Sequence, residues 1–381
     1  YAESPAYVNA LIGALSGSGA PPSPDTQQQL DLTLQLMQDV GTLGTTAYTC
    51  GQLNANSREN RFDIEIQDTL SIGEQLRLIS GASYRHDNVS SETYFNGSRR
   101  KNIGRLFGHA EWYATPKWLL QGGAMYEHDS MVGDSLSPRV AVNYLLHPAH
   151  GLRAVYAEAV RSPDMFEEAA NWQMQVRDLQ PAVLGRTSAP LFLTSQSSGN
   201  LRQEHIVSRE LGYNGSFASL GLHLDLRLFD EDITDLMTFW PTLGDPGPSN
   251  DDRLSFRGWE SDANWQLGLS DRLRLSYAYI EFEATHHYDS ELTPRHSGSL
   301  SWLRDWGRGW KSNLTYLGAD SLNENRFERV DLFVAKRFQI GNSTLELSGT
   351  WQQRLDDNPL GGRNTNYKQR HAYWLSAGVE L

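Results

Sequence analysis

The stretch that decides the fold of this chain is Leu220-Gly221-Leu222-His223-Leu224-Asp225-Leu226-Arg227-Leu228-Phe229. Every second residue is leucine, while most of the positions between are polar or charged. Such alternation predicts a β-strand with one wholly aliphatic face. Because similar contrasts return in strand after strand, the aliphatic side must meet lipid or a second sheet. We interpret the chain as an all-β, membrane-spanning antiparallel β-barrel with a polar interior.

Composition is compatible with this interpretation. The chain has 381 residues, a formal net charge of −13 and 39% hydrophobic residues. Its overall hydropathy resembles that of a soluble protein, but a barrel with a polar lumen spreads its apolar residues over alternate positions and scores alike. No apolar run approaches the roughly 18 residues that a membrane helix needs. The composition therefore excludes a helical membrane protein, and the acidic balance argues against a nucleic-acid partner.

The alternation predicts 15 strands in the region 58–381, which we interpret as the transmembrane barrel strands. The predicted strands are 58–69, 75–88, 100–114, 117–130, 137–147, 150–161, 202–216, 219–235, 251–266, 271–286, 293–304, 309–319, 325–338, 342–355 and 370–381. Each is long enough for the about 9–11 residues that a tilted strand needs to cross a bilayer. For residues 1–57 the sequence predicts an extracellular loop with two short helices. The alternating leucines in 28–40 are also compatible with a sixteenth strand.

The connections between strands alternate between tight and long. Thr-Pro-Lys after Ala114 is tight, whereas the longest connections span about 40 residues at 162–201 and about 14 at 356–369. Short turns on one rim and long loops on the other are typical of outer-membrane barrels. Aromatic residues such as Trp112, Trp118 and Trp302 gather near strand ends, which predicts girdles at the membrane interfaces.

Several strings resemble TonB-dependent outer-membrane receptors. They are Ser137-Pro138-Arg139-Val140-Ala141-Val142-Asn143-Tyr144, Leu152-Arg153-Ala154-Val155-Tyr156, Arg161-Ser162-Pro163-Asp164-Met165-Phe166-Glu167, Glu210-Leu211-Gly212-Tyr213, Phe229-Asp230-Glu231-Asp232-Ile233-Thr234-Asp235-Leu236 and Arg329-Val330-Asp331-Leu332-Phe333-Val334-Ala335-Lys336-Arg337-Phe338. The resemblance covers residues 58–381 and implies the later part of a barrel of about 22 strands around an N-terminal plug.

The resemblance also implies function. A receptor of this family takes up a bulky, scarce nutrient with energy from the TonB complex, which grips a plug that we cannot place in this chain. The ligand expected first is a ferric siderophore, and cobalamin and haem are less favoured alternatives. The implied partners are the TonB complex, outer-membrane lipid and lipopolysaccharide, and a metal-chelate ligand. The expected location is the bacterial outer membrane, and no catalytic residue, cofactor or resident metal is expected.

Strand parity carries a further expectation. An odd number of strands would need a parallel seam to close, which bacterial barrels disfavour. We therefore expect the natural protein to continue upstream with about seven more strands and a plug. Two alternatives stay open. A passive porin would close with 16 strands if 28–40 is a strand, and a barrel enzyme would need Ser, His and a carboxylate at the rim, for which the chain has no G-x-S-x-G motif.

Loop residues that could bind a ligand supply rings and cations. The candidates are Tyr94, Phe95, Trp172, Phe192, Phe239, Trp240, Arg363, Tyr367, Lys368 and Arg370. Trp172 is the expected anchor, because it lies in the longest loop and large aromatic residues contribute most at binding sites.

Three smaller features complete the set of candidates. Arg99, Arg100 and Lys101 could bind lipopolysaccharide phosphates or form an ordinary solvated run. We interpret His286 and His287 as surface residues, because adjacent histidines in a loop are weak evidence for a metal site. Cys50 is the only cysteine, so it cannot form a disulfide within this chain, and it is expected either to pair with a cysteine elsewhere or to be a free thiol.

Overall fold

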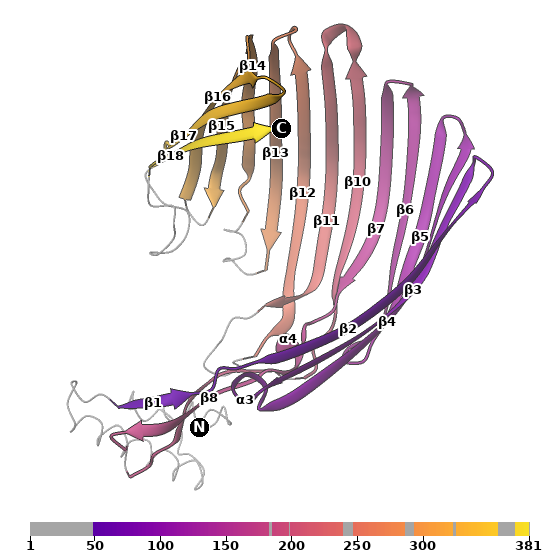
Figure 1. Cartoon of the computed structure of the whole chain (residues 1–381). Helices are drawn as coiled ribbons and strands as arrows, with labels where there is room; N and C mark the ends of the chain where they lie inside the picture. Colours follow the sequence, from indigo (N-terminus) through magenta and orange to yellow (C-terminus); the bar gives the residue numbers. More distant parts are fainter. Residues whose placement is uncertain are drawn as a thin grey trace.

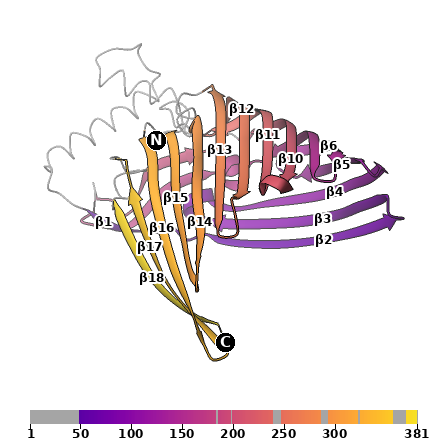
Figure 2. The ribbon, with the colours of Figure 1, turned by 90° about the horizontal axis from the view of Figure 1, so that it is seen from above.

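A computed structural model describes residues 49–182, 185–197, 199–238, 247–285, 293–322, 325–356 and 370–380. One antiparallel sheet of 15 strands dominates it, and neighbours in the sheet follow chain order except where β7 pairs with β10. Figures 1 and 2 show this sheet as a tall curved wall. The predicted all-β antiparallel fold is therefore confirmed.

The strands of the large sheet are β2 (Arg58–Ile72), β3 (Leu76–Ser91), β4 (Gly97–Thr115), β5 (Trp118–Asp129), β6 (Gly133–His147), β7 (His150–Arg161), β10 (Glu204–Phe217), β11 (Leu222–Thr238), β12 (Ser249–Gln266), β13 (Asp271–Ala284), β14 (His296–Gly307), β15 (Trp310–Leu322), β16 (Asn325–Ile340), β17 (Ser343–Arg354) and β18 (His371–Glu380). All 15 predicted strands are present. Most differences are shifts of a few residues at the ends, where propensity is least informative.

The leucine-rich stretch at 220–229 shows one such difference. Ala218–Leu220 form a 3₁₀ turn, η1, and Gly221 follows with a φ of 63°. This left-handed conformation favours glycine, and it turns the chain into β11. Leu220 therefore lies in the turn instead of in the strand, and the leucine face runs from Leu222 to Leu228.

Register places the leucines of β11 opposite other apolar residues on one face of the sheet. Leu228 pairs with Trp259 of β12, and Leu226 pairs with Tyr213 of β10. On the opposite face, Arg227 forms ion pairs with carboxylates of β10, β11 and β12. We call the leucine face the outer face and the charged face the inner face. Their separation is the pattern of a barrel wall with a polar lumen.

Aromatic residues on the outer face lie close to the short turns, as predicted. Trp112, Trp118 and Trp265 are each more than 40% exposed. The ring of Trp118 packs 4.3 Å from that of Tyr144 across β5 and β6. The indole of Trp265 donates to the carbonyl of Leu220 in the turn. These rings therefore form one of the two predicted girdles.

The edges of the large sheet are β2 and β18. Within the described part of the chain, β2 pairs with β3 alone and β18 with β17 alone, so these strands do not form a closed 16-strand ring. The alternative strand at 28–40 lies outside the described residues. Among the residues that are described, no helix is both long and apolar enough to cross a membrane.

A second, small sheet was not predicted. β1 (Cys50–Leu53), β8 (Asn171–Gln180) and β9 (Ala189–Gln196) form three antiparallel strands. β8 and β9 belong to the segment 162–201, which therefore contains regular structure where the sequence suggested only a long loop. Two short helices accompany this sheet, α3 (Glu92–Phe95) and α4 (Met165–Ala169). All lie at the end of the wall opposite the short turns (Figure 1).

Candidate ligand-binding site

The connection between β7 and β10, residues 162–203, is clamped at its base. Arg161 ends β7, and Glu204 begins β10 opposite it. Nε and an Nη of Arg161 donate to the two carboxylate oxygens of Glu204 at 2.5 and 2.8 Å, while its other Nη reaches Glu167 at 3.0 Å. Glu204 also accepts the backbone N–H of Met237 at 2.8 Å. Both ends of this connection, which we call the β7–β10 loop, are thus held by charge-assisted hydrogen bonds.

A buried ion pair fixes the start of the loop against the inner face. Nζ of Lys101 lies 2.7 Å from Oδ2 of Asp129, and it donates to the carbonyl of Pro163 at 2.6 Å. The two side chains are only 6% and 0% exposed. Lys101 is therefore used inside the wall, which corrects the expectation that it joins its neighbours in an exterior phosphate site. Arg100 is exposed on the opposite face, whereas Arg99 alternates onto the same face of β4 as Lys101 and is partly buried. Lipopolysaccharide contact stays a prediction for Arg99 and Arg100.

Helix α4 continues the inward path of the loop. Asp164 caps it and forms a capping box with Glu167, which satisfies backbone donors at the helix start. Glu168 is buried and accepts the backbone N–H of Leu201 at 3.1 Å, near the far end of the loop. Burial raises the pKa of the Glu168 carboxyl above its usual value, although the Leu201 N–H and Lys101 oppose the shift. Glu168 thus joins the two arms of the loop.

Four aromatic residues form a cluster between α3 and the β7–β10 loop. The ring centroid of Trp172 lies 5.5 Å from that of Tyr94 and 5.8 Å from that of Phe166, and Phe95 lies 6.0 Å from Phe166. Beside them, Glu92 accepts hydrogen bonds from Arg177 of β8 and from Asn54. These bonds, led by that of Arg177, hold the pKa of Glu92 below its usual value. The cluster packs the loop onto the neighbouring β3–β4 connection.

A cavity of about 630 Å³ lies between the base of the loop and the inner face of β2–β5. Arg61, Arg85 and Arg105 line it from the wall, and Phe95 and Phe166 line it from the helices. Its volume falls within the range usual for small-molecule sites, and its lining combines apolar side chains with nine charged ones, five of them cationic. The cavity can therefore hold a ligand that carries both rings and negative charge.

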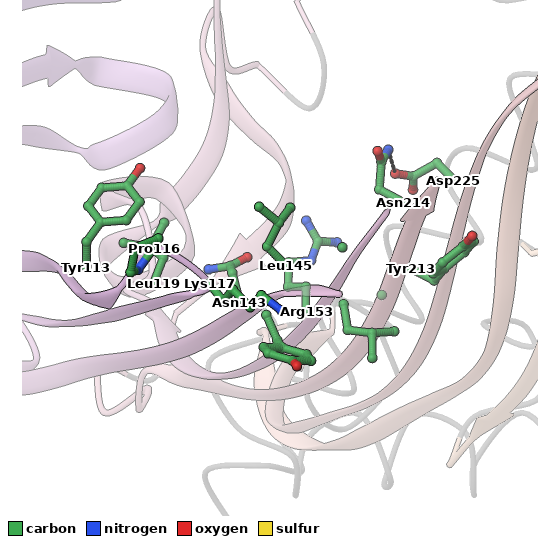
Figure 3. A pocket seen from close by; sticks show the side chains of 14 residues that line it. Tyr113, Pro116, Lys117, Leu119, Asn143, Leu145, Arg153, Tyr213, Asn214 and Asp225 are labelled. Carbon is green, nitrogen blue, oxygen red and sulfur yellow. Dashed lines mark hydrogen bonds between the residues drawn. The ribbon is translucent and has the colours of Figure 1, made fainter. Parts of the chain in front are cut away.

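A second cavity of about 410 Å³ lies at the short-turn end of the sheet (Figure 3). Asn143 and Arg153 line it from β6 and β7, and Asn214 of β10 donates to Asp225 of β11 at 2.8 Å across from them. This site lies far along the wall from the β7–β10 loop and α4, so it does not share their binding surface.

The remaining predicted site residues divide by whether the structure describes them. Trp172 lies in the aromatic cluster, partly buried. Arg370 is exposed just before β18, where its carbonyl accepts the N–H of Arg354 at 2.9 Å. Phe192 belongs to β9, but its side chain is outside the described part. The other candidates outside the described residues are Phe239, Trp240, Arg363, Tyr367 and Lys368, together with His286 and His287.

Comparison with known proteins decides the family. A family model described as TonB dependent receptor-like, beta-barrel matches residues 12–369. The chain belongs to the TonB-dependent receptor family. The resemblance seen in the sequence is thereby confirmed, and the family consists of transport receptors of the bacterial outer membrane. A search of curated proteins found no match.

Solved structures share the fold of this TonB-dependent receptor chain. The siderophore receptor PirA of Pseudomonas aeruginosa matches with a TM-score of 0.65 at 14% identity, over 85% of this chain and 56% of its own. PirA of Acinetobacter baumannii matches with 0.58 at 14%, over 77% and 50%. The hemophore receptor HasR of Serratia marcescens, in complex with HasA and heme, matches with 0.60 at 15%, over 78% and 56%. This chain spans about half the length of these receptors.

Sequence reasoning overlooked the inner-wall residues of the site. The sequence predicted Arg61, Arg85 and Arg105 only as members of strands, because many strands of such a wall carry inward charges. A signal was nevertheless present, since each occupies the polar side of an alternating strand near its long-loop end. Which of the many inward charges share a cavity depends on register between strands, and a single strand does not encode it.

Proposed function

We propose that this chain is the barrel part of an outer-membrane receptor for active, TonB-coupled uptake of a bulky, scarce nutrient, and that this nutrient is a ferric siderophore. The observation that carries the proposal is the clamped β7–β10 loop, whose base lines a polar and aromatic cavity against the inner wall. A passive pore needs no such binding site. The family and the names of the structural neighbours, which include siderophore receptors, support the same class of ligand.

The proposal includes partners and orientation. The TonB complex would act through a plug domain, residues 1–57 would form an extracellular loop region, and residues 58–381 would span the outer membrane and contact its lipid and lipopolysaccharide. Cys50 offers a direct test of orientation because it is exposed in β1. A membrane-impermeant maleimide should label the full-length protein on intact cells but leave a Cys50→Ser variant unlabelled. Labelling only after cell lysis would refute the extracellular placement.

Uptake is tested by growth. A strain that lacks the gene should fail under iron limitation when one particular ferric siderophore is the sole iron source, and the full-length gene should restore growth. Separate cultures with haem as the iron source, and with cobalamin as the limiting nutrient, test the two other ligand classes. Unchanged growth of the deletion strain on every iron chelate would refute the siderophore proposal.

A further inference from the structure

Three arginines reach the cavity from adjacent strands of the inner wall. Arg61 lies on β2, Arg85 on β3 and Arg105 on β4, and all three line the same cavity beneath the β7–β10 loop. Their side chains are 60%, 25% and 28% exposed. They are therefore close together, solvent-accessible and on the side of the wall where a ligand would enter.

The way these arginines are anchored leaves donors unused. Nε of Arg61 donates to Asp87 at 2.7 Å, and Nε of Arg105 donates to Glu127 at 2.6 Å. In the described part of the chain, the Nη atoms of Arg61 and Arg105 have no hydrogen-bond partner. Arg161, by contrast, uses Nε and both Nη atoms on Glu204 and Glu167. The carboxylates thus orient Arg61 and Arg105 without occupying the ends of their guanidinium groups.

We propose that Arg61, Arg85 and Arg105 form an oxyanion-binding site, so that the transported ligand carries carboxylate-type groups on its surface; this inference rests on the proposed function. A guanidinium end offers two parallel N–H donors that match a carboxylate. Because Asp87 and Glu127 already fix the side chains, little rotamer freedom is lost on binding. Phe95 and Phe166 line the same cavity and would contact the apolar body of the ligand.

The buried polar groups beside the site do not compete for the ligand. Asp87 accepts from both Arg61 and Arg85, and Glu127 accepts from Arg105 and from the hydroxyl of Ser162 at 3.0 Å. Lys101 and Asp129 neutralise each other. The exposed charged groups that remain at the cavity are the guanidinium ends of Arg61 and Arg105 and the carboxylate of Glu59, since Arg85 is held on Asp87 through Nε and an Nη. The two guanidinium ends outnumber the one carboxylate, so the remaining charge favours an anion.

The test compares chelates that differ in charge. Binding of ferric citrate, an anionic carboxylate chelate, and of a neutral ferric trihydroxamate is measured by calorimetry on the purified full-length receptor. Arg61→Gln and Arg105→Gln should each weaken ferric citrate binding about tenfold or more, which corresponds to the loss of a charge-assisted hydrogen bond. The same variants should change trihydroxamate binding less than about twofold. Arg77→Gln is the matched control, because Arg77 lies on the same face of β3 as Arg85, is 54% exposed and does not line the cavity.

The possible outcomes distinguish failure of the oxyanion site from failure of the proposed uptake function. Ferric citrate binding that is unchanged in the Arg61 and Arg105 variants, or weakened equally by Arg77→Gln, would overturn the oxyanion site. Wild-type preference for the neutral trihydroxamate would also overturn it, while leaving siderophore uptake intact. If wild-type protein binds neither chelate and the deletion strain grows normally on every chelate, the proposed function fails together with the site. Circular dichroism and heat-modifiable gel mobility would verify that each variant is folded.

Discussion

Replacing Leu224 with arginine tests the assignment of the two faces most directly. Leu224 lies on the outer face of β11, between Gly221 in the short turn and Asp230, the first charge on that face. A strand rises about 3.4 Å per residue, so at a tilt of about 45° it advances about 2.4 Å along the membrane normal. The nine steps from Gly221 to Asp230 then span about 22 Å, close to the apolar band of about 25 Å in outer-membrane barrels.

The geometry sets the expected magnitude. Leu224 lies about 4 Å from the middle of this band, where arginine on the lipid face costs about 2–4 kcal/mol. We expect Leu224→Arg to destabilise the folded protein by about 3 kcal/mol, roughly a hundredfold in the folding equilibrium. The neighbouring substitution His223→Arg is the control, because His223 lies at nearly the same depth on the inner face. It should cost less than about 1 kcal/mol.

The assay is reversible urea unfolding of the full-length protein in lipid vesicles, followed by tryptophan fluorescence. A Leu224→Asn variant separates the effect of charge from the effect of lost aliphatic contact. Equal costs for Leu224→Arg and His223→Arg, or for Leu224→Arg and Leu224→Asn, would show that the outer face of β11 does not meet lipid.

Three further predictions concern the β7–β10 loop. Lys101→Met leaves the buried Asp129 carboxylate without its partner, and removing one partner of a buried ion pair costs about 3–5 kcal/mol. Backbone hydrogen exchange at 164–170 should therefore accelerate. Unchanged protection would contradict the role of the Lys101–Asp129 pair in fixing the start of the loop. Burial raises the pKa of Glu168 above its ordinary 4.5, so its contribution to stability is full below pH 4.5 and is lost as pH rises through the folded pKa. Glu168→Gln keeps the acceptor for Leu201 and should remove this pH dependence from Leu201 amide protection, whereas a persistent dependence would place its origin elsewhere. Trp172→Ala should weaken ligand binding at least several-fold, because the ring packs the loop against Phe166 and Tyr94. Wild-type affinity in this variant would show that Trp172 has only a structural role in the loop.

The fold could be predicted because a barrel wall imposes a rule on every strand. Each strand separates a lipid face from an aqueous face, so alternation in β11 appears as four leucines between polar residues, and the same rule located all 15 strands. The small sheet of β1, β8 and β9 escaped prediction because its strands pair with one another and β8 packs on α3, so no lipid-facing alternation marks them. Predicted ligand residues outside the described part, such as Trp240 and Lys368, stay predictions.

By itself, the sequence determined the strand order, the outer and inner faces and the family, because these depend on local period-two patterning and on short strings within single strands. The tertiary structure alone decided which charges act together. Lys101 looked like part of an exposed cationic run, but the register of β4 against β5 brings Asp129 to it and buries both. Arg61 and Arg105 are 44 positions apart and share a cavity only because β2, β3 and β4 pair in sequence order. Contacts between strands arise from long-range pairing and from the fold of the β7–β10 loop, and no local pattern carries that information.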